Sequence, residues 1–231
     1  MAILTVIPAR SGSKRVPGKN SKIISGKPLI AHTIIAAQKA GCCGEIVVST
    51  DSQEIADIAL KYNAIVPCLR PSNLSQDESD VMHAIIHMIE LYNKKNIHFD
   101  SVLLLQPTSL FRKSDTIRKA VELHELSGLS VVSVNPISLK HSWYKSIDIT
   151  GNLDTPELFR NAQSDDLSED LYILNGAIYI TTIEQLLVNQ SFYGNPTKAF
   201  LMDASSECLD IDTWQDWALA EKLIESKKEV L

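Results

Sequence analysis

Short β-branched runs alternate with amphipathic stretches of helical length along this chain, and this pattern limits the folds that it can adopt. It continues through the first 134 residues, with expected strands at 4–9, 45–49, 65–69, 101–105 and 129–134, and expected helices at 28–39, 53–62, 80–92 and 114–126. This alternation is typical of βαβ units, in which helices cover both faces of a mostly parallel sheet. We therefore expect a three-layer, Rossmann-like α/β fold whose ligands bind at the carboxyl ends of the strands.

The alternation ends after Pro136. Residues 142–149 have an extended pattern and 154–171 are polar, irregular and acidic, whereas 172–181 and 199–203 are expected strands, 183–188 a short helix and 212–227 a closing helix. One domain over residues 1–231, with an inserted arm at about 137–172, accounts for the whole length. Apolar arm residues such as Trp143, Tyr144 and Leu158 favour packing on a second subunit, so we expect the arm to mediate a homodimer.

Charge is distributed unevenly along the chain. Lys and Arg number 22 against 28 Asp and Glu, yet six of the cations lie within residues 1–30, and the first acidic residue is Glu45. An acidic body without a second basic stripe excludes a binder of nucleic acid polymers, whereas a compact basic loop suits a small, multiply charged anion. No apolar run approaches the ~20 residues that span a bilayer, and the first residues do not resemble a signal peptide. We therefore expect a cytoplasmic protein without a membrane segment.

The loop after the first expected strand carries the clearest chemical signal. Gly12, Gly18 and two serines allow close backbone approach to an anion, while Arg10, Lys14 and Lys19 supply positive charge. This combination predicts a triphosphate cradle. The loop is not a Walker A motif, because five residues separate its glycines and Asn20 stands where a Ser or Thr would bind magnesium.

Several further motifs follow that loop in order: Gly26-Lys27-Pro28-Leu29-Ile30, Val48-Ser49-Thr50-Asp51, Leu69-Arg70-Pro71, Leu105-Gln106-Pro107-Thr108-Ser109, Asn175-Gly176-Ala177-Ile178-Tyr179 and Asp210-Ile211-Asp212-Thr213. With them the chain resembles the acylneuraminate cytidylyltransferases, or CMP-sialic acid synthetases, over nearly its full length. The resemblance implies a nucleotide-diphospho-sugar transferase type of fold. It also implies a reaction in which the anomeric hydroxyl of a nine-carbon α-keto sugar acid attacks the α-phosphate of CTP, giving the CMP-sugar and pyrophosphate with Mg²⁺ (or Mn²⁺).

The resemblance also implies roles for individual residues. Residues expected to bind CTP are Arg10, Ser11, Gly12, Ser13, Lys14, Lys19, Asn20 and Arg70, with Asn20 and Arg70 near the cytosine. Residues expected to bind the sugar are Gln106, Asn175, Phe192 and Tyr193. The expected catalytic residues are Arg10, Lys19 and Asp212. Phosphoryl transfer needs positioning and charge neutralisation more than a covalent nucleophile, and the motifs contain no obvious one.

Asp210 and Asp212 are the expected metal ligands. If this segment is extended, both carboxylates lie on one face and Ile211 turns into the core. Two such carboxylates suit magnesium, which completes its coordination with water and substrate phosphates. Asp212 is also a candidate N-cap for the closing helix, a role that would occupy one of its oxygens.

The sugar is less well defined than the nucleotide. N-acetylneuraminate users usually have a basic segment in this region, whereas the stretch 160–170 has Arg160 as its sole cation. Legionaminate, pseudaminate or another nonulosonate is therefore as plausible a substrate as N-acetylneuraminate. Lys140 or Lys145 is a candidate for a cation that binds the sugar carboxylate. A 3-deoxy-manno-octulosonate cytidylyltransferase is the nearest alternative, disfavoured by Gly12-Ser13-Lys14-Arg15 and Asn20. A CTP-binding protein without turnover is another, disfavoured by the presence of both aspartates.

Overall fold

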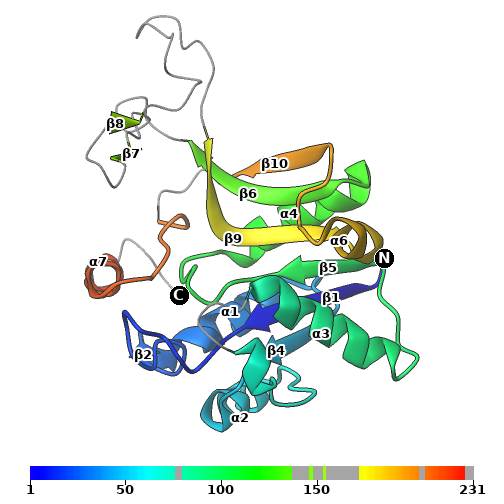
Figure 1. Ribbon diagram of the computed structural model, residues 1–231. Helices are drawn as coiled ribbons and strands as arrows, with labels where there is room; N and C mark the ends of the chain where they lie inside the picture. The colour runs from blue at the N-terminus through cyan, green and yellow to red at the C-terminus, as the bar shows by residue number, and fades with distance from the viewer. Residues whose placement is uncertain (76–79, 137–145, 148–152, 155–171, 203–205, 227–231) are drawn as a thin grey trace, which may run out of the picture.

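The computed structural model describes residues 1–75, 80–136, 146–147, 153–154, 172–202 and 206–226 (Figure 1). Its centre is a six-stranded sheet in the order β10-β6-β9-β5-β1-β4. These strands are β1 (Ile3–Pro8), β4 (Glu45–Ser49), β5 (Ser101–Leu104), β6 (Ser130–Pro136), β9 (Tyr172–Thr182) and β10 (Thr197–Leu201). Two short pairs lie outside it, β2 (Ile23–Ile24) with β3 (Lys27–Pro28) and β7 (Ser146–Ile147) with β8 (Leu153–Asp154).

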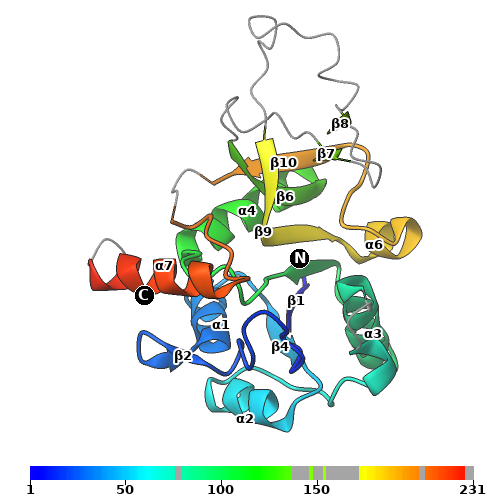
Figure 2. The same ribbon diagram turned by 60° about the vertical axis from the view of Figure 1, so that its left-hand side comes forward.

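Helices cover both faces of the sheet (Figure 2). They are α1 (Leu29–Ala40), α2 (Gln53–Lys61), α3 (Val81–Asn93), α4 (Ser114–Ser127) and α6 (Ile183–Asn189), with a 3₁₀ turn at Ser72–Leu74. The closing helix α7 (Trp214–Glu225) packs instead in a separate apolar cluster with β2 and the start of α1. Alternate residues of β5 enter opposite apolar layers: Leu103 packs with α1, α2 and α4, while Leu104 packs with α3 and α6. The three-layer α/β fold expected from the sequence is confirmed.

The sheet is mostly parallel, with one strand reversed. β4, β1 and β5 are parallel neighbours and β10 is parallel to β6, but β9 runs antiparallel to both β5 and β6. Because Leu104 at the end of β5 pairs with Tyr179, the earlier residues of β9 extend past that end. The reversal therefore brings Gly176 beside the loop that follows β5.

The prediction of a strand at 65–69 is wrong. Only Ile65 forms a β-bridge, with Val47, and the following residues pair with no strand in the described part of the chain. Pro67 explains the interruption, because proline has no N–H to donate to a ladder. Arg70 is nevertheless held at the carboxyl end of β4, since its backbone N–H donates to the Thr50 carbonyl over 2.7 Å.

Most of the expected arm at 137–172 lies outside the described residues, including Lys140, Trp143, Tyr144, Lys145, Leu158 and Arg160. The β7–β8 pairing and the start of β9 are its described parts. Its role in a homodimer and the single-domain organisation therefore stay predictions. No helix in the described ranges combines the length and apolar character needed to cross a membrane.

Candidate active site

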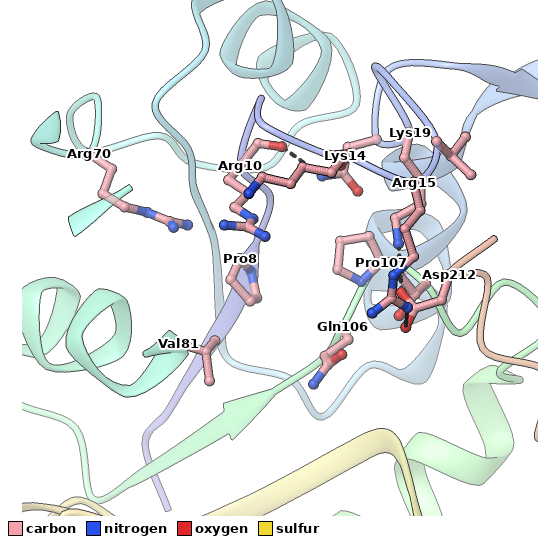
Figure 3. A pocket seen from close by; sticks show the side chains of 14 residues that line it. Pro8, Arg10, Lys14, Arg15, Lys19, Arg70, Val81, Gln106, Pro107 and Asp212 are labelled. Atoms are coloured by element: carbon pink, nitrogen blue, oxygen red, sulfur yellow. Dashed lines mark hydrogen bonds and ion pairs between the residues drawn. The ribbon is translucent and has the colours of Figure 1, made fainter. Parts of the chain in front are cut away.

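A cavity of about 560 Å³ opens at the carboxyl ends of β1 and β5 (Figure 3). Its walls come from the loop after β1, the loop after β5, Arg70 and the segment preceding α7. The site residues expected from the sequence that line it are Arg10, Ser13, Lys14, Lys19, Asn20, Arg70, Gln106 and Asp212. The fold thus gathers residues from both ends of the chain at the strand edge where α/β sheets bind ligands.

Two guanidinium groups face each other across one part of the cavity. Figure 3 shows the side chains of Arg10 and Arg70 pointing toward one another. Arg70 is held by hydrogen bonds from Nε to Ser49 Oγ (3.1 Å) and from Nη2 to the Ser49 carbonyl. Burial lowers the pKa of Arg70, the Asp51 carboxylate opposes this shift, and the Arg10 charge adds to it. Positive charge so concentrated favours an anionic ligand.

Asp212 joins the basic loop to the C-terminal segment. Lys19 Nζ donates to Asp212 Oδ1 (3.0 Å) and to the Ile211 carbonyl (2.7 Å), and Arg15 Nη1 donates to Asp212 Oδ2 (3.1 Å). The Lys19 side chain is 12% exposed and that of Arg15 is 68% exposed, so the Lys19 ion pair is less screened by water. Arg15, a cation of the loop that received no firm role from the sequence, thus belongs to the site.

Asp210 presents a buried oxygen without a partner. Its Oδ1 accepts no hydrogen bond in the structure, while Ile211 between the two aspartates is fully buried, as expected. Burial raises the pKa of Asp210, a Thr108 hydrogen bond opposes that shift, and the nearby Asp212 charge adds to it. Asp210 is not among the cavity-lining residues, and its unsatisfied carboxylate oxygen is available to a water or a cation.

The donor set fits a hard divalent cation that also binds substrate. The described residues contain no group of three or more His, Cys, Asp or Glu able to hold a metal by themselves. Magnesium does not need such a group, because one or two carboxylates suffice when phosphate oxygens and water complete its shell. Asp210 and Asp212 therefore suit a metal that arrives with a triphosphate.

The N-cap of α7 is Thr213, so the capping role considered for Asp212 is wrong. Thr213 Oγ1 accepts from the Asp216 N–H (3.3 Å), while Asp216 Oδ2 accepts from the backbone N–H groups of Thr213 (2.7 Å) and Asp212 (3.0 Å). This reciprocal capping box satisfies the first turn without either Asp212 carboxylate oxygen. Both oxygens therefore face the loop cations instead.

Ser11 is turned away from the cavity lining and toward Asp51. The Asp51 carboxylate accepts from the Ser11 N–H (2.8 Å) and from Ser11 Oγ (2.7 Å). Gly12, beside it, is exposed and has open space around its Cα. Asp51 was assigned no role from the sequence. Its position at the end of the Val48-Ser49-Thr50-Asp51 motif, directly after a strand, was the sequence signal that could have indicated one.

Of the two amides expected to bind the sugar, Gln106 lines the cavity and Asn175 does not. The Asn175 side chain is engaged between strands, accepting from Ser133 Oγ and the Ala177 N–H (3.0 Å) and donating to Asn135 Oδ1 (2.7 Å). These contacts use both ends of the amide. The structure therefore does not place Asn175 among the cavity-lining residues.

Phe192 and Tyr193 also lie outside the cavity lining. Phe192 is buried in the apolar layer beneath α3, and its ring centroid is 5.7 Å from that of Tyr179. Tyr193 is 46% exposed and packs edge-on against Tyr179 at 6.4 Å. The pair therefore forms an aromatic cluster with Tyr179 of β9, and Tyr193 is its accessible member.

A family model described as cytidylyltransferase matches residues 4–228, and the chain belongs to this family. Among its relatives is the CMP-N,N'-diacetyllegionaminic acid synthase of Legionella pneumophila, 57% identical over 231 residues that cover 100% of both chains. A pseudaminic acid cytidylyltransferase of Campylobacter jejuni is 31% identical, with 99% of each chain covered. The N-acylneuraminate cytidylyltransferase of Escherichia coli is 34% identical, and the match covers 97% of this chain but 52% of that protein.

Solved structures agree with the fold. The CMP:2-keto-3-deoxy-manno-octonic acid synthetase complexed with CTP superposes with a TM-score of 0.75 at 16% identity, covering 98% of this chain and 100% of the other. The 4-diphosphocytidyl-2C-methyl-D-erythritol synthase of Anaerococcus prevotii gives 0.67 at 14% identity, covering 97% and 98%. The expected fold and the expected class of enzyme, a cytidylyltransferase, are confirmed. The roles of individual site residues stay predictions.

Proposed function

We propose that this cytidylyltransferase transfers the cytidylyl group of CTP to a nonulosonic acid of the N,N'-diacetyllegionaminate class, releasing pyrophosphate. The observation that carries the proposal is the convergence of the basic loop and Asp212 on one cavity, in a chain 57% identical over its full length to a relative named for that product. Relatives named for pseudaminic acid and N-acylneuraminate are 31% and 34% identical. The larger identity favours the diacetyllegionaminate class.

CTP would bind with its triphosphate along the loop and its base toward Arg70. Arg10, Lys14 and Lys19 would neutralise the phosphates, and the fact that all three line the cavity supports this assignment. Asn20 Nδ2 donates to the Arg10 carbonyl (3.1 Å), while its buried Oδ1 has no partner. A cytosine amino group would supply the donor that this oxygen lacks.

The acceptor would bind on the Gln106 side of the cavity. In the chemical step the anomeric hydroxyl would lose its proton to solvent and its oxygen would bond to the α-phosphorus. The bond between the α-phosphorus and the oxygen that bridges to the β-phosphorus would break, so that its electron pair leaves with pyrophosphate. Lys19 and Arg10 would stabilise the charge developing on that leaving group. No enzyme-bound intermediate is needed, because holding the reactants in line supplies much of the rate enhancement.

Asp210 and Asp212 would hold Mg²⁺ (or Mn²⁺) against the α-phosphate. The unsatisfied Asp210 oxygen and the cavity-facing Asp212 support this assignment. When bound, the metal would neutralise phosphate charge and lower the pKa of the attacking hydroxyl.

The enzyme would act as a cytoplasmic homodimer. Three adjacent apolar residues at the start of β9, Tyr172, Ile173 and Leu174, pair with the end of β6 and are each 44–47% exposed. An exposed apolar run of this kind favours a second copy as its partner. Light scattering after size-exclusion chromatography would test this, with a mass of one chain contradicting it.

The acceptor is tested by a panel of acids assayed with CTP and Mg²⁺, scored by kcat/KM. The panel contains N,N'-diacetyllegionaminic, pseudaminic, N-acetylneuraminic and 3-deoxy-manno-octulosonic acids. The proposal expects the first to exceed the others by at least about tenfold, since a few unpaired polar groups in a pocket cost that much or more. Preference for the eight-carbon acid would support the nearest alternative, and CTP binding without turnover would support a silent binding protein.

A further inference from the structure

Arg112, between the loop after β5 and the start of α4, buries its guanidinium among two backbone carbonyls and one hydroxyl, which come from three segments. The residue is 3% exposed. Its Nη1 donates to the carbonyls of Gln106 (3.1 Å) and Ala177 (2.7 Å), and its Nη2 donates to Thr33 Oγ1 of α1 (3.0 Å). No carboxylate of the described residues accepts a hydrogen bond from it.

The charge of Arg112 is costly where it lies. Burial lowers its pKa to about 10, so the guanidinium still carries its charge at neutral pH. Nε has no hydrogen-bond partner in the structure. Electrostatic attraction to Cys43 and to the Glu207 carboxylate opposes this lowering of the pKa, although neither accepts a hydrogen bond from Arg112. A buried charge still destabilises a fold unless other contacts compensate, and an apolar side chain of similar length would avoid that cost. The carbonyl contacts are therefore the distinctive contribution of this residue.

One of those carbonyls, of Ala177, belongs to β9, and the other, of Gln106, belongs to the loop that follows β5. The β5–β9 ladder ends at Leu104 and Tyr179, and the next residues, toward Gln106 and Ala177, lie beyond it. Beyond the end of the ladder, where the described residues of these two segments no longer pair as strands, Arg112 Nη1 joins the segments through hydrogen bonds to both carbonyls. At Gly176, which precedes Ala177, an added Cβ would lie 3.7 Å from Gln106 Oε1. The Gln106 side chain therefore contacts the Gly176–Ala177 segment.

We propose that Arg112 is a positioning residue that fixes the distance between Gln106 and the Gly176–Ala177 segment, and so shapes the acceptor side of the cavity without touching substrate. The assignment of Gln106 to the acceptor rests on the proposed function. The hydrogen bonds of Arg112 reach neither the loop after β1 nor Arg70, which form the CTP side. Loss of Arg112 should therefore affect the acceptor much more than CTP.

The first test compares Arg112→Lys with Arg118→Met. Lysine keeps the charge but cannot reproduce the planar fork that joins two carbonyls and a hydroxyl. Arg118 is the matched control, because it also donates to backbone carbonyls, those of Ala40 (3.2 Å) and Lys39 (3.4 Å), away from the cavity-lining residues. We expect Arg112→Lys to raise the KM for the acceptor about tenfold or more while the Kd for CTP stays within about twofold. Arg118→Met should change neither.

A double-mutant cycle tests whether Arg112 acts through Gln106. If it does, Arg112→Lys combined with Gln106→Ala should raise the acceptor KM no further than Gln106→Ala alone. Additive effects, or equal losses for CTP and acceptor, would show a general structural role and overturn the inference. Thermal midpoints measured alongside separate these outcomes from unfolding.

Thr33→Val keeps the test decisive if Arg112→Lys does not fold. This nearly isosteric change removes one acceptor of the guanidinium and leaves both carbonyls in place. The inference expects a rise of about threefold in acceptor KM at unchanged CTP affinity. A lower thermal midpoint with unchanged acceptor KM would contradict it. Parent turnover is measured first, because its absence would refute the proposed function rather than this inference.

Discussion

Lys19 Nζ lies 3.0 Å from Asp212 Oδ1, although 193 positions separate the two residues in the chain. The same nitrogen donates to the Ile211 carbonyl, so the basic loop is bound to both the backbone and the carboxylate of the segment before α7. Without a ligand, Asp212 thus balances part of the loop charge.

Replacing Asp212 by Asn should reduce kcat about 100-fold or more while leaving the fold intact, because it removes one of the two carboxylates proposed to hold the metal against the α-phosphate. The Asp212 side chain is 48% exposed, so its loss should hardly change the thermal midpoint. Asp115→Asn is the control, since Asp115 pairs with Arg118 at the surface. Near-normal turnover by Asp212→Asn would remove this residue from the catalytic machinery.

Asp51→Ala should weaken CTP binding more than Ser11→Ala does. The Asp51 carboxylate holds the loop through both the N–H and the hydroxyl of Ser11, whereas the serine substitution removes the hydroxyl contact alone. We expect about a tenfold rise in the Kd for CTP with Asp51→Ala and about twofold with Ser11→Ala. Calorimetric titration with CTP measures both, and equal effects would contradict this account of the loop.

Asp210 predicts a characteristic dependence on pH. Its pKa in the folded state is raised, chiefly by burial, so protonation stabilises the fold and this stabilisation is lost as pH rises through the folded pKa. Asp210→Asn should therefore have a higher thermal midpoint than the parent at neutral pH and approach it at acid pH. Midpoints measured over a pH series check this, and a constant difference at all pH values would contradict it.

The same carboxyl should govern metal binding at low pH. Magnesium requires the ionised form, so Mg²⁺-dependent turnover should decline at a higher pH than an ordinary aspartate would produce. The apparent Mg²⁺ requirement, measured at saturating CTP across the same series, should increase as pH falls. An unchanged requirement would argue against Asp210 as a ligand.

Asp216→Ala should destabilise the fold by about 1 kcal/mol through loss of the capping box. It should also lower turnover, because Asp216 accepts the backbone N–H of Asp212 and so helps to fix that residue. Urea unfolding and initial rates at saturating substrates measure the two effects. Full activity in a destabilised variant would show that the cap serves α7 alone.

The sequence predicted most of the sheet and the loop side of the site, because both depend on local patterns. β-branched runs bounded by polar turns mark β1, β4, β5 and β6. Glycines and cations directly after β1 predict an anion cradle, and the structure places Arg10, Lys14 and Lys19 around one cavity.

Features that depend on distant contacts were not predictable in this way. Hydrophobic alternation is the same in either strand direction, so it gave no sign that β9 is antiparallel to its neighbours. Nor could it show that Asn175 would be engaged with Ser133 and Asn135 of β6 rather than lining the cavity. Arg112 presented no signal at all, because its partners are mostly backbone carbonyls, which every residue has.

The most direct test of the account is formation of product from CTP and N,N'-diacetyllegionaminic acid, followed by ³¹P NMR. With Mg²⁺ present, the account predicts equal amounts of pyrophosphate and a CMP diester, with neither formed when the acid or the metal is omitted. CTP that binds but stays intact, or that yields CMP and pyrophosphate without a sugar adduct, would contradict it.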